Sequence, residues 1–562
     1  MIAAFLALAW RCFYLQFFRY EHYTAACRTQ QEVRVIQNPQ RGAILDCRGR
    51  VLAASNKVQR IFAEQRAIRD PRSISAELAP IVEKSTQEIY ELITESRNPG
   101  FVKIKEPADE NQCIAAAKIR GIGIQSDWQR NYPAGPLVSH IVGFTSADNH
   151  GLAGVELEYD KKLRGSEGRD VFLADAPPFR RPVRPFPQPD ETSRLSDGVG
   201  IILTIDATIQ QFAKEELIKQ YQSFGAESAV AIVAEPKTGA ILAMVSLPDF
   251  DPAQAGSADA DHLRNRAITD EFEPGSIIKP VAAAVAVDSG AVGRNEVFFC
   301  EYGSYHGKGF GQIGEYGTHR FGDLTLREIL INSSNIGMAK VGQKVGKDRL
   351  YNGMRLFGFG KKTGIDLPGE ADGVLWPVSK WTGYSVTRIP FGQEITVTAI
   401  QLVQAFSILA NGGHLVRPYI VRAIVDSNGN TAKIKQPTPP IGFIIKPEVA
   451  KWIVSDALVG AVNDGTGKLA KLEKWQVFGK TGTANIAEAD RKGYSGSNYV
   501  ASFIGGAPAD DPAIIVLVSI RKPNKKLGYT GGTVSAPAAG RIIEKTLNYL
   551  EKEQRQPESI QN

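Results

Sequence analysis

The sequence predicts a multidomain α/β (α+β) protein whose larger domain is an antiparallel sheet covered by helices. The chain has 562 residues, which is too many for one ordinary hydrophobic core. Six prolines between positions 176 and 197 separate two parts of different character. In the second part, strand-like apolar runs lie near both ends, with amphipathic helical runs between them. Helices layered on a sheet have this pattern.

Composition narrows the class of protein. Hydrophobic residues make up 43% and charged residues 22% of the chain, which excludes a polytopic membrane protein and a disordered chain. The formal charge of +6 comes from residues 1–60, which hold nine Lys/Arg against three Asp/Glu. A nucleic-acid-binding protein would carry such an excess on a folded face. We therefore expect no nucleic-acid partner.

Residues 1–18, MIAAFLALAWRCFYLQFF, are almost entirely apolar. A membrane-spanning helix needs about 20 apolar residues, so this run is short. No small-residue cleavage site follows it, which argues against a removed signal peptide. A buried core helix is the alternative interpretation. We expect an uncleaved membrane anchor over 1–18, with further apolar residues upstream of Met1 in the native protein.

The next part, residues 19–175, mixes strands and helices. Strands are expected at Glu32–Ile36 and Ala43–Leu45, and one helical stretch at Ser73–Ser96. The proline density of residues 176–197 disfavours both helix and sheet, so this segment is expected to be a linker. A second domain is expected over 198–553, followed by a polar tail at 554–562.

Two hairpins frame the second domain. Ala229–Ala234 and Ala240–Ser246 are apolar strands joined by the turn sequence Pro-Lys-Thr-Gly. Tyr499–Ile504 and Ile514–Ile520 form the second pair, around a turn at Pro508–Pro512. Amphipathic helices are expected at Asp323–Ile331, Thr398–Asn411 and Val534–Lys552.

Patterns for metals and cofactors are weak. The five cysteines are scattered without zinc or redox spacing; Cys300, His306 and His319 are near one another in sequence and are the only metal candidates. Gly309–Gly314 fits the glycine pattern of a dinucleotide site, but no strand precedes it and no helix follows, which favours a flexible loop. We expect neither a metal nor a cofactor.

The segment Glu273–Pro280 carries the strongest chemical signal. Pro-Gly followed by an apolar run predicts the start of a helix. Ser276 and Lys279 are three residues apart and would share one face of that helix. A serine hydroxyl needs a base to become a nucleophile, and Lys279 is the candidate in this segment. Lys279 could accept a proton only if burial or a second cation lowered its pKa.

Two further segments complete a possible site. Asn332–Asn335 could offer a hydroxyl relay and an amide for a substrate carbonyl. In Lys480–Thr483, one lysine and two hydroxyls could grip a carboxylate, and Gly482 would let a ligand approach the backbone. Lys480 would also be the second cation near Lys279. Each segment alone is more often structural, but all three in this order favour a serine acyltransferase.

Ser-x-x-Lys, Ser-x-Asn and Lys-Thr-Gly together resemble the active-site set of penicillin-binding proteins and serine β-lactamases. The resemblance extends over essentially the whole chain. Residues 41–46 (RGAILD), 130–143 and 151–156 (GLAGVE) resemble the non-catalytic module of class B penicillin-binding proteins. Residues 203–210 (LTIDATIQ), 391–401 (FGQEITVTAIQ) and 499–508 (YVASFIGGAP) resemble their transpeptidase domain.

Two positions depart from the family pattern. Cys47 stands after Asp46 where an arginine is usual, which puts a pedestal contact in doubt. Ser334 stands where class A β-lactamases have aspartate, which favours a synthase over a lactamase.

The resemblance implies a fold and an activity. The fold would be a penicillin-binding/serine β-lactamase-like transpeptidase domain, preceded by an elongated α+β pedestal (dimerisation) domain and a membrane helix. The activity would be penicillin-sensitive cross-linking of peptidoglycan stem peptides that end in D-Ala-D-Ala. By the resemblance, Ser276, Lys279 and Ser333 are catalytic, and the residues that bind substrate are Asn335, Lys480, Thr481, Gly482 and Thr483.

The resemblance also implies a setting. The partners would be stem-peptide donors and amine acceptors, β-lactams, the cytoplasmic membrane, a glycosyltransferase and division proteins. The chain would cross the inner membrane once, with its catalytic domain outside. A role in septal synthesis, in division or sporulation, is favoured. The alternatives are an elongation enzyme, a β-lactam sensor or β-lactamase, and an inert division scaffold.

Overall fold

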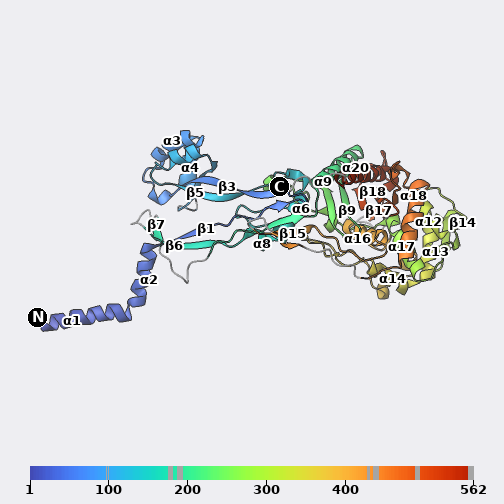
Figure 1. Ribbon diagram of the computed structural model, residues 1–562, viewed down its shortest axis with the longest axis horizontal. Coiled ribbons are helices and arrows are strands. Elements are labelled where there is room, and N and C mark those ends of the chain that lie inside the picture. Colours follow the sequence, from blue (N-terminus) through green and yellow to red (C-terminus); the bar gives the residue numbers. More distant parts are fainter. Residues whose placement is uncertain are drawn as a thin grey trace. The chain divides into compact units, whose positions relative to one another are not determined.

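The computed structural model describes most of the chain and divides it into two compact units (Figure 1). Unit 1 comprises Met1–Ala43, Ala54–Asn131 and Lys161–Gly200, and unit 2 comprises Ile44–Ala53, Tyr132–Asp160 and Ile201–Asn562. The described residues are 1–96, 98, 100–174, 182–185, 194–426, 431–434, 442–487 and 494–554. Each unit is built from segments that are not contiguous in sequence.

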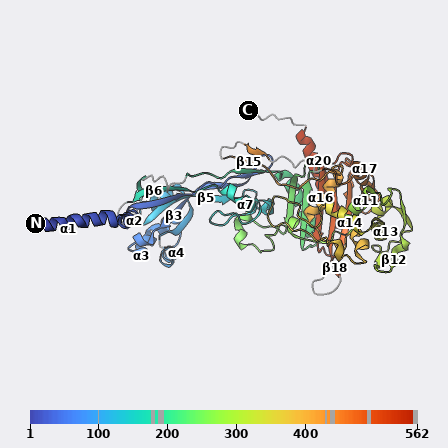
Figure 2. The ribbon, with the colours of Figure 1, turned by 90° about the horizontal axis from the view of Figure 1, so that it is seen from below.

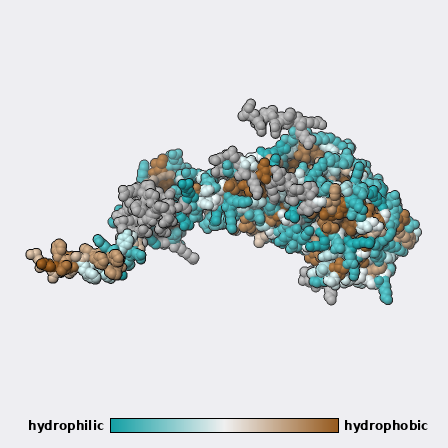
Figure 3. Space-filling view, turned by 60° about the horizontal axis from the view of Figure 1, so that its bottom comes forward, coloured by the Kyte–Doolittle hydropathy of each residue, from teal (hydrophilic) through white to brown (hydrophobic). Residues whose placement is uncertain are grey.

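The apolar N-terminus of unit 1 is helical. Helix α1 (Ile2–Phe13) continues into a π-helical turn at Tyr14–Phe18, and α2 (Tyr20–Gln31) follows after Arg19. The side chains of α1 are exposed and, apart from Arg11, mostly apolar, as the largely brown helix in Figure 3 shows. Within the described chain, no single helix is both long and apolar enough to cross a membrane. Two consecutive helical segments are long and apolar enough to span a membrane only when taken together. They are Ile2–Phe18 and Tyr20–Ala26, and the angle between them is 71°.

One sheet of unit 1 changes the interpretation of the proline-rich segment. Strand β1 (Glu32–Gln37) pairs with β6 (Gly168–Ala174), and β6 pairs with β7 (Pro182–Pro185). The segment expected to avoid sheet structure thus contributes an edge strand, a position where a missing backbone donor is tolerated. Two parts of the predicted linker, residues 176–181 and 186–193, lie outside the described residues.

A second group of strands in unit 1 carries its helices. Strand β3 (Val51–Ala63) pairs with β4 (Val102–Ala108) and β5 (Ile122–Asn131). Helices α3 (Pro71–Val82), α4 (Thr86–Glu95) and α5 (Glu110–Ala116) share a core with these strands.

The single helix predicted at Ser73–Ser96 is two helices. Glu83 takes a left-handed conformation (φ +57°) that ends α3, and the Ser85 hydroxyl accepts the N–H of Glu88 to begin α4.

The main sheet of unit 2 is antiparallel throughout, with the order β10-β9-β19-β18-β17. Its strands are β9 (Ser228–Ala234), β10 (Ile241–Leu247), β17 (Phe478–Ala487), β18 (Tyr494–Ala507) and β19 (Ile514–Arg521). Both predicted hairpins are present, and β9 pairs with β19 to join them into one sheet. The predicted antiparallel sheet is confirmed.

Helices cover both faces of this sheet (Figure 1), and Figure 2 views it from the face that α16 covers. On one face, α9 (Ala207–Ser223) and α20 (Ala536–Gln554) pack on alternate residues of the strands, including Ala231 and Val518. On the other face, α16 (Ala399–Ala410) packs against β9 and β19. Every residue of α16 is buried, so this apolar helix lies inside the domain. The predicted layered architecture is confirmed.

The segment around Cys47 answers the doubt that this residue raised. Strand β2 (Ile44–Leu45) pairs in parallel with β8 (Gly200–Leu203). Just after β2, Arg48 Nε lies 2.8 Å from Asp206 Oδ2, and Arg50 Nη2 lies 2.6 Å from both Asp206 Oδ1 and Asp46 Oδ2. Neighbouring arginines therefore bind the two acids although position 47 is a cysteine.

Candidate active site

The nucleophile segment begins a helix, as its sequence predicts. Gly275–Ile278 form one 3₁₀ turn that leads into α11 (Lys279–Asp288). Gly275 has a φ of +55°, and a Cβ there would lie 3.1 Å from the carbonyl oxygen of Thr483 on β17. The backbone of the turn thus lies against the edge strand of the main sheet. Ser276 lines a cavity of about 610 Å³, and the side chain of Lys279 is completely buried.

The second segment is a junction between two helices. Helix α12 (Leu326–Asn332) ends at Ser333, which takes a left-handed conformation (φ +60°). Ser334 then begins α13 (Asn335–Val345), and its hydroxyl accepts the N–H of Gly337 at 2.9 Å. The reversal between the helices leaves Ser333 and Asn335 lining the cavity.

The third segment lies on β17, the edge strand of the main sheet. Lys480 is fully buried, while Thr481 and Thr483 line the cavity. A Cβ at Gly482 would lie 2.8 Å from Ile277 Cγ1 and 2.9 Å from the carbonyl oxygen of Pro274. The close approach that requires glycine is therefore made by the nucleophile turn and not, as was predicted from the sequence, by a ligand.

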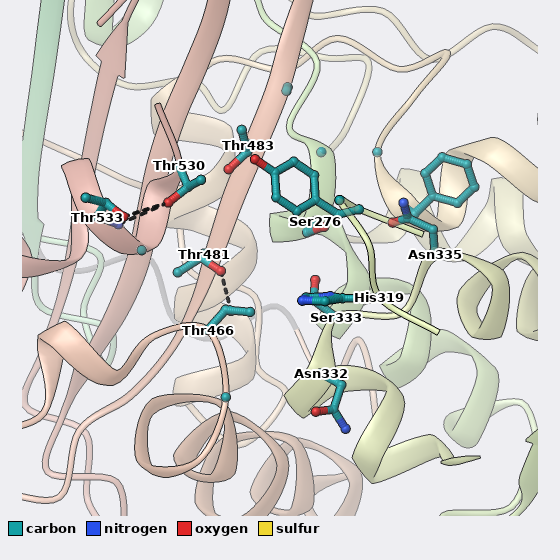
Figure 4. Close-up of a pocket in the computed structure, with 18 of the residues that line it drawn as sticks. Ser276, His319, Asn332, Ser333, Asn335, Thr466, Thr481, Thr483, Thr530 and Thr533 are labelled. Carbon is teal, nitrogen blue, oxygen red and sulfur yellow. Dashed lines mark hydrogen bonds between the residues drawn. The ribbon is translucent and has the colours of Figure 1, made fainter. Parts of the chain in front are cut away.

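Five of the eight predicted site residues line one cavity, which Figure 4 shows; Lys279, Lys480 and Gly482 do not line it. Thr481 and Thr483 project from β17 on one side of Ser276, and Ser333 and Asn335 lie on the other. Thr466 and Thr481 share a hydrogen bond of 2.5 Å between their hydroxyls. Three segments far apart in sequence thus converge on Ser276.

Ser333 connects the two buried lysines. Its Oγ accepts hydrogen bonds from Lys279 Nζ at 3.2 Å and from Lys480 Nζ at 2.9 Å. Lys279 Nζ also donates to the Ser333 carbonyl at 2.5 Å and to Asn335 Oδ1 at 2.8 Å. No hydrogen bond joins Lys279 to Ser276 among the residues described, although the sequence predicted that the two would meet.

The electrostatics of the two lysines favour a neutral amine. Burial lowers the pKa of Lys279 well below its usual value, and the neighbouring charge of Lys480 lowers it further; Glu315 opposes both. Burial lowers the pKa of Lys480 to about 7. Both shifts favour the neutral form of the amines, and a neutral Lys279 could accept a proton.

Glu315 is a member of this arrangement that the sequence did not indicate. Its Oε1 accepts the Ser334 hydroxyl at 2.5 Å, and its Oε2 accepts the Asn335 backbone N–H at 2.7 Å. The carboxylate therefore sits at the positive end of α13 and fixes the start of that helix. It precedes Ser334 by 19 residues, and no spacing rule connects an acid at that distance to a helix start.

The weaker motifs also have clear structures. Ser304–Gly307 (β12) and Gly311–Gly314 (β13) form a hairpin where a flexible loop was expected. Cys300 is buried with its thiol 3.5 Å from the Phe298 carbonyl, and His306 bonds to Ser304 at 2.9 Å. His319 lines the catalytic cavity. Across the described part of the chain, no group of three or more His, Cys, Asp or Glu side chains could hold a metal.

Comparison with protein families gives two matches. Residues 229–544 match the penicillin binding protein transpeptidase domain, and residues 36–177 match the penicillin-binding protein dimerisation domain. The three active-site segments all fall within the first match.

Curated proteins and solved structures agree with these families. Stage V sporulation protein D of Bacillus subtilis is 34% identical over 98% of this chain and 84% of its own length. The peptidoglycan D,D-transpeptidase FtsI of Escherichia coli is 29% identical over 90% of this chain and 82% of its own. The crystal structure of penicillin binding protein 3 from Mycobacterium tuberculosis with aztreonam superposes with a TM-score of 0.71 at 26% identity. It covers 93% of this chain and 98% of that one.

Proposed function

The chain belongs to the class B penicillin-binding proteins and is a serine-type D,D-transpeptidase, and from this premise we propose how its side chains cross-link peptidoglycan. The convergence of Ser276, Ser333 and Thr483 on one cavity, beside two buried lysines, is the observation that carries the proposal.

The donor is a stem peptide that ends in D-Ala-D-Ala. Its terminal carboxylate binds at the hydroxyls of Thr481 and Thr483, in the positive field of Lys480. Asn335 lies across Ser276 from these threonines and orients the peptide amide (Figure 4). Gly482 contributes by letting the nucleophile turn pack closely on β17.

Ser276 attacks the carbonyl of the penultimate residue. Lys279 takes the hydroxyl proton, for which its amine must be neutral, as its lowered pKa permits. The backbone N–H groups of Ser276 and Thr483 stabilise the oxyanion; a donor of this kind typically contributes about 3 kcal/mol to the transition state. Ser333 passes a proton to the departing amine of D-alanine, since its hydroxyl already bonds to both lysines.

The acyl-enzyme is then resolved by the amine of a second stem peptide, which produces the cross-link and frees Ser276. A β-lactam would enter the same route, because its strained amide takes the place of the scissile bond. The relative solved with aztreonam supports this expectation for the present chain.

Covalent labelling tests the proposal. A fluorescent penicillin should attach to the purified chain, and peptide mass spectrometry should place the adduct on Ser276. The variant Ser276→Ala should remain unlabelled. Labelling that persists in the variant, or an adduct on another residue, would exclude Ser276 as the nucleophile.

We place the enzyme in septal wall synthesis, during division or sporulation. The names of two relatives, stage V sporulation protein D and FtsI, support this placement, together with the motif Gly392–Gln401. A glycosyltransferase and division proteins would be its partners. A fluorescent fusion in the native host should concentrate at septa; uniform labelling of the side wall would instead indicate elongation.

We also propose that the chain is anchored in the cytoplasmic membrane with its catalytic part outside. The exposed apolar surface of α1 and the bent pair Ile2–Phe18 and Tyr20–Ala26 support an anchor. The domain limits stay as proposed from the sequence, with the pedestal over 19–175 and the transpeptidase over 198–553.

A further inference from the structure

A second cavity of about 460 Å³ lies beside the catalytic one in unit 2. Glu273 lines both cavities. One loop separates them, because Phe391–Gln393 line the catalytic cavity and Glu394–Thr396 line the second. The two spaces are therefore neighbours on either side of a single stretch of backbone.

The separating loop is fixed to the nucleophile turn. The N–H of Gly275 donates to the carbonyl of Gly392 at 3.2 Å, and the N–H of Glu394 donates to Glu273 Oε1 at 3.0 Å. A Cβ at Gly392 would lie 2.1 Å from the carbonyl oxygen of Gly275. Glu394 itself takes a left-handed conformation, with a φ of +59°. Such a conformation in a residue other than glycine is often found at functional sites.

The walls of the second cavity combine acids with aromatic rings. Glu273 and Glu394 supply two carboxylates, and the hydroxyl of Ser385 donates to Glu394 at 2.5 Å. Trp376 and Trp381 supply indole rings, and the Lys380 amine lies 4.4 Å from the centre of the Trp376 ring. Arg388 lines neither cavity and bonds to Gln393 and Gln312.

This lining suits a molecule that carries an amine next to a carboxylate. Carboxylates and indole faces attract an ammonium group, and the single lysine attracts a carboxylate. The charge balance of the lining is two acids against one base, which favours a cation overall.

We propose that the second cavity is the acceptor subsite, which holds the amine-bearing residue of the second stem peptide beside the acyl-enzyme. This assignment rests on the proposed transpeptidase function. The donor carboxylate occupies the side of the catalytic cavity formed by β17, so the acceptor arrives from the side of Phe391–Gln393 and Glu273.

The transfer step balances with the groups already described. The acceptor amine attacks the ester carbonyl on Ser276, and the new carbon–nitrogen bond replaces the bond to Ser276 Oγ. The acceptor binds as an ammonium ion and first gives one proton to solvent, which leaves the neutral amine that attacks. The second proton, lost as the carbon–nitrogen bond forms, passes through Lys279 to the released Oγ. Water competes for the same carbonyl, so a bound acceptor raises the share of cross-linking over hydrolysis.

The test separates the two halves of the reaction. Acylation is followed with a fluorescent penicillin. Transfer is followed with a benzoyl-D-alanyl thioester as donor and D-alanine as acceptor, measured as the ratio of dipeptide to hydrolysed product. The variants Glu394→Gln and Trp376→Leu should acylate within about twofold of wild type, while the transfer ratio falls by about tenfold.

Matched controls exist in the same unit. Glu301 also has a left-handed conformation (φ +51°) and pairs with Lys340 at 2.6 Å, away from both cavities. The Lys474 amine lies 4.2 Å from the centre of the Trp475 ring, an arrangement like that of Lys380 over Trp376. Glu301→Gln and Trp475→Leu should leave the transfer ratio unchanged.

A third variant tests the role of the lysine. Lys380→Gln should reduce the preference for D-alanine over D-alaninamide, because the two acceptors differ only in the carboxylate. The acceptor assignment would be overturned if Glu394→Gln and Trp376→Leu left the transfer ratio unchanged, or if they reduced acylation and transfer equally. The proposed function would not be affected by either result. A wild-type chain that takes no penicillin would overturn the proposed function together with the acceptor assignment.

Discussion

At the scale of single residues, the chemistry of the active site depends on the protonation of its two buried lysines. Lys279 and Lys480 are fully buried and share Ser333 Oγ, and Glu315 is the acid that influences the pKa of Lys279. The charge of Glu315 favours the ammonium form of Lys279, whereas burial and Lys480 favour the neutral amine. Glu315 thus raises the pKa of Lys279 against two larger effects, and with it the pH at which the base becomes available.

The variant Glu315→Gln tests this role. Removal of the negative charge lowers the pKa of Lys279 further, so the rise of the acylation rate with pH should move to lower pH. The loss of one charged hydrogen bond to the start of α13 should also reduce the maximal rate, by roughly tenfold. Stopped-flow acylation by a fluorescent penicillin between pH 5 and 9 measures both effects.

Glu328→Gln is the control for this experiment. Glu328 caps α12 through the N–H of Thr325 at 2.8 Å, as Glu315 caps α13. Its substitution should leave the pH profile in place. A profile that is identical in Glu315→Gln and wild type would show that Glu315 acts only as a cap.

At the scale of elements, the sequence predicted most of the structure around the site. The strands of the main sheet are apolar runs bounded by turn residues, so both hairpins could be identified. The break at Glu83 could not be identified, because a left-handed glutamate leaves no compositional signal. The three catalytic segments were found from their residue types and their order. Glu315 was not found, because it lies 19 residues before Ser334. The second cavity was not found either, because residues 374–396, which form all of its lining except Glu273, carry no motif that indicates a cavity.

Helices α9 and α20 are joined by a buried acid. Glu216 on α9 accepts Lys545 at 2.7 Å and Arg541 at 2.5 Å, both on α20. Burial opposes ionisation, but hydrogen bonds from Lys219, Lys545 and Arg541 outweigh it and lower the pKa of Glu216 from 4.5 to about 2. A carboxyl whose pKa is lowered on folding stabilises the fold above its unfolded pKa.

Glu216→Gln should therefore destabilise the protein by about 1–3 kcal/mol at pH 7. In wild type this contribution is lost as the pH falls from about 4.5 towards 2, so the difference between the two proteins should shrink across that range. Urea unfolding of both proteins at pH 7 and at pH 3 measures the difference in their free energies of unfolding. A difference that stays constant with pH would mean that Glu216 is not ionised in the folded state.

At the scale of the whole molecule, function depends on two independent properties. Unit 2 contains every active-site segment, and the apolar N-terminus belongs to unit 1. The side chains of α1 are exposed, so they contribute nothing to a folded core. Attachment to a membrane and penicillin binding should therefore be separable by mutation.

The double variant Phe5→Asp, Leu8→Asp tests that separation. Both side chains are exposed, at 79% and 63%, so the fold should tolerate the change. The full-length chain should move from the membrane pellet to the soluble fraction, while penicillin labelling stays unchanged. The pair Leu356→Asp, Leu527→Asp, at exposed positions of unit 2, should remain in the pellet. Unaltered fractionation of the first variant would contradict the anchor.

The helix junction at Ser333 has a consequence for the design of inactive mutants. Because Ser333 has a φ of +60°, replacement by alanine would remove the hydroxyl and also keep a Cβ in a conformation that disfavours it. Glycine accepts this backbone freely, so Ser333→Gly deletes the hydroxyl with little added strain. A comparison of the two substitutions would separate the contribution of the hydroxyl from the cost of the bend between α12 and α13.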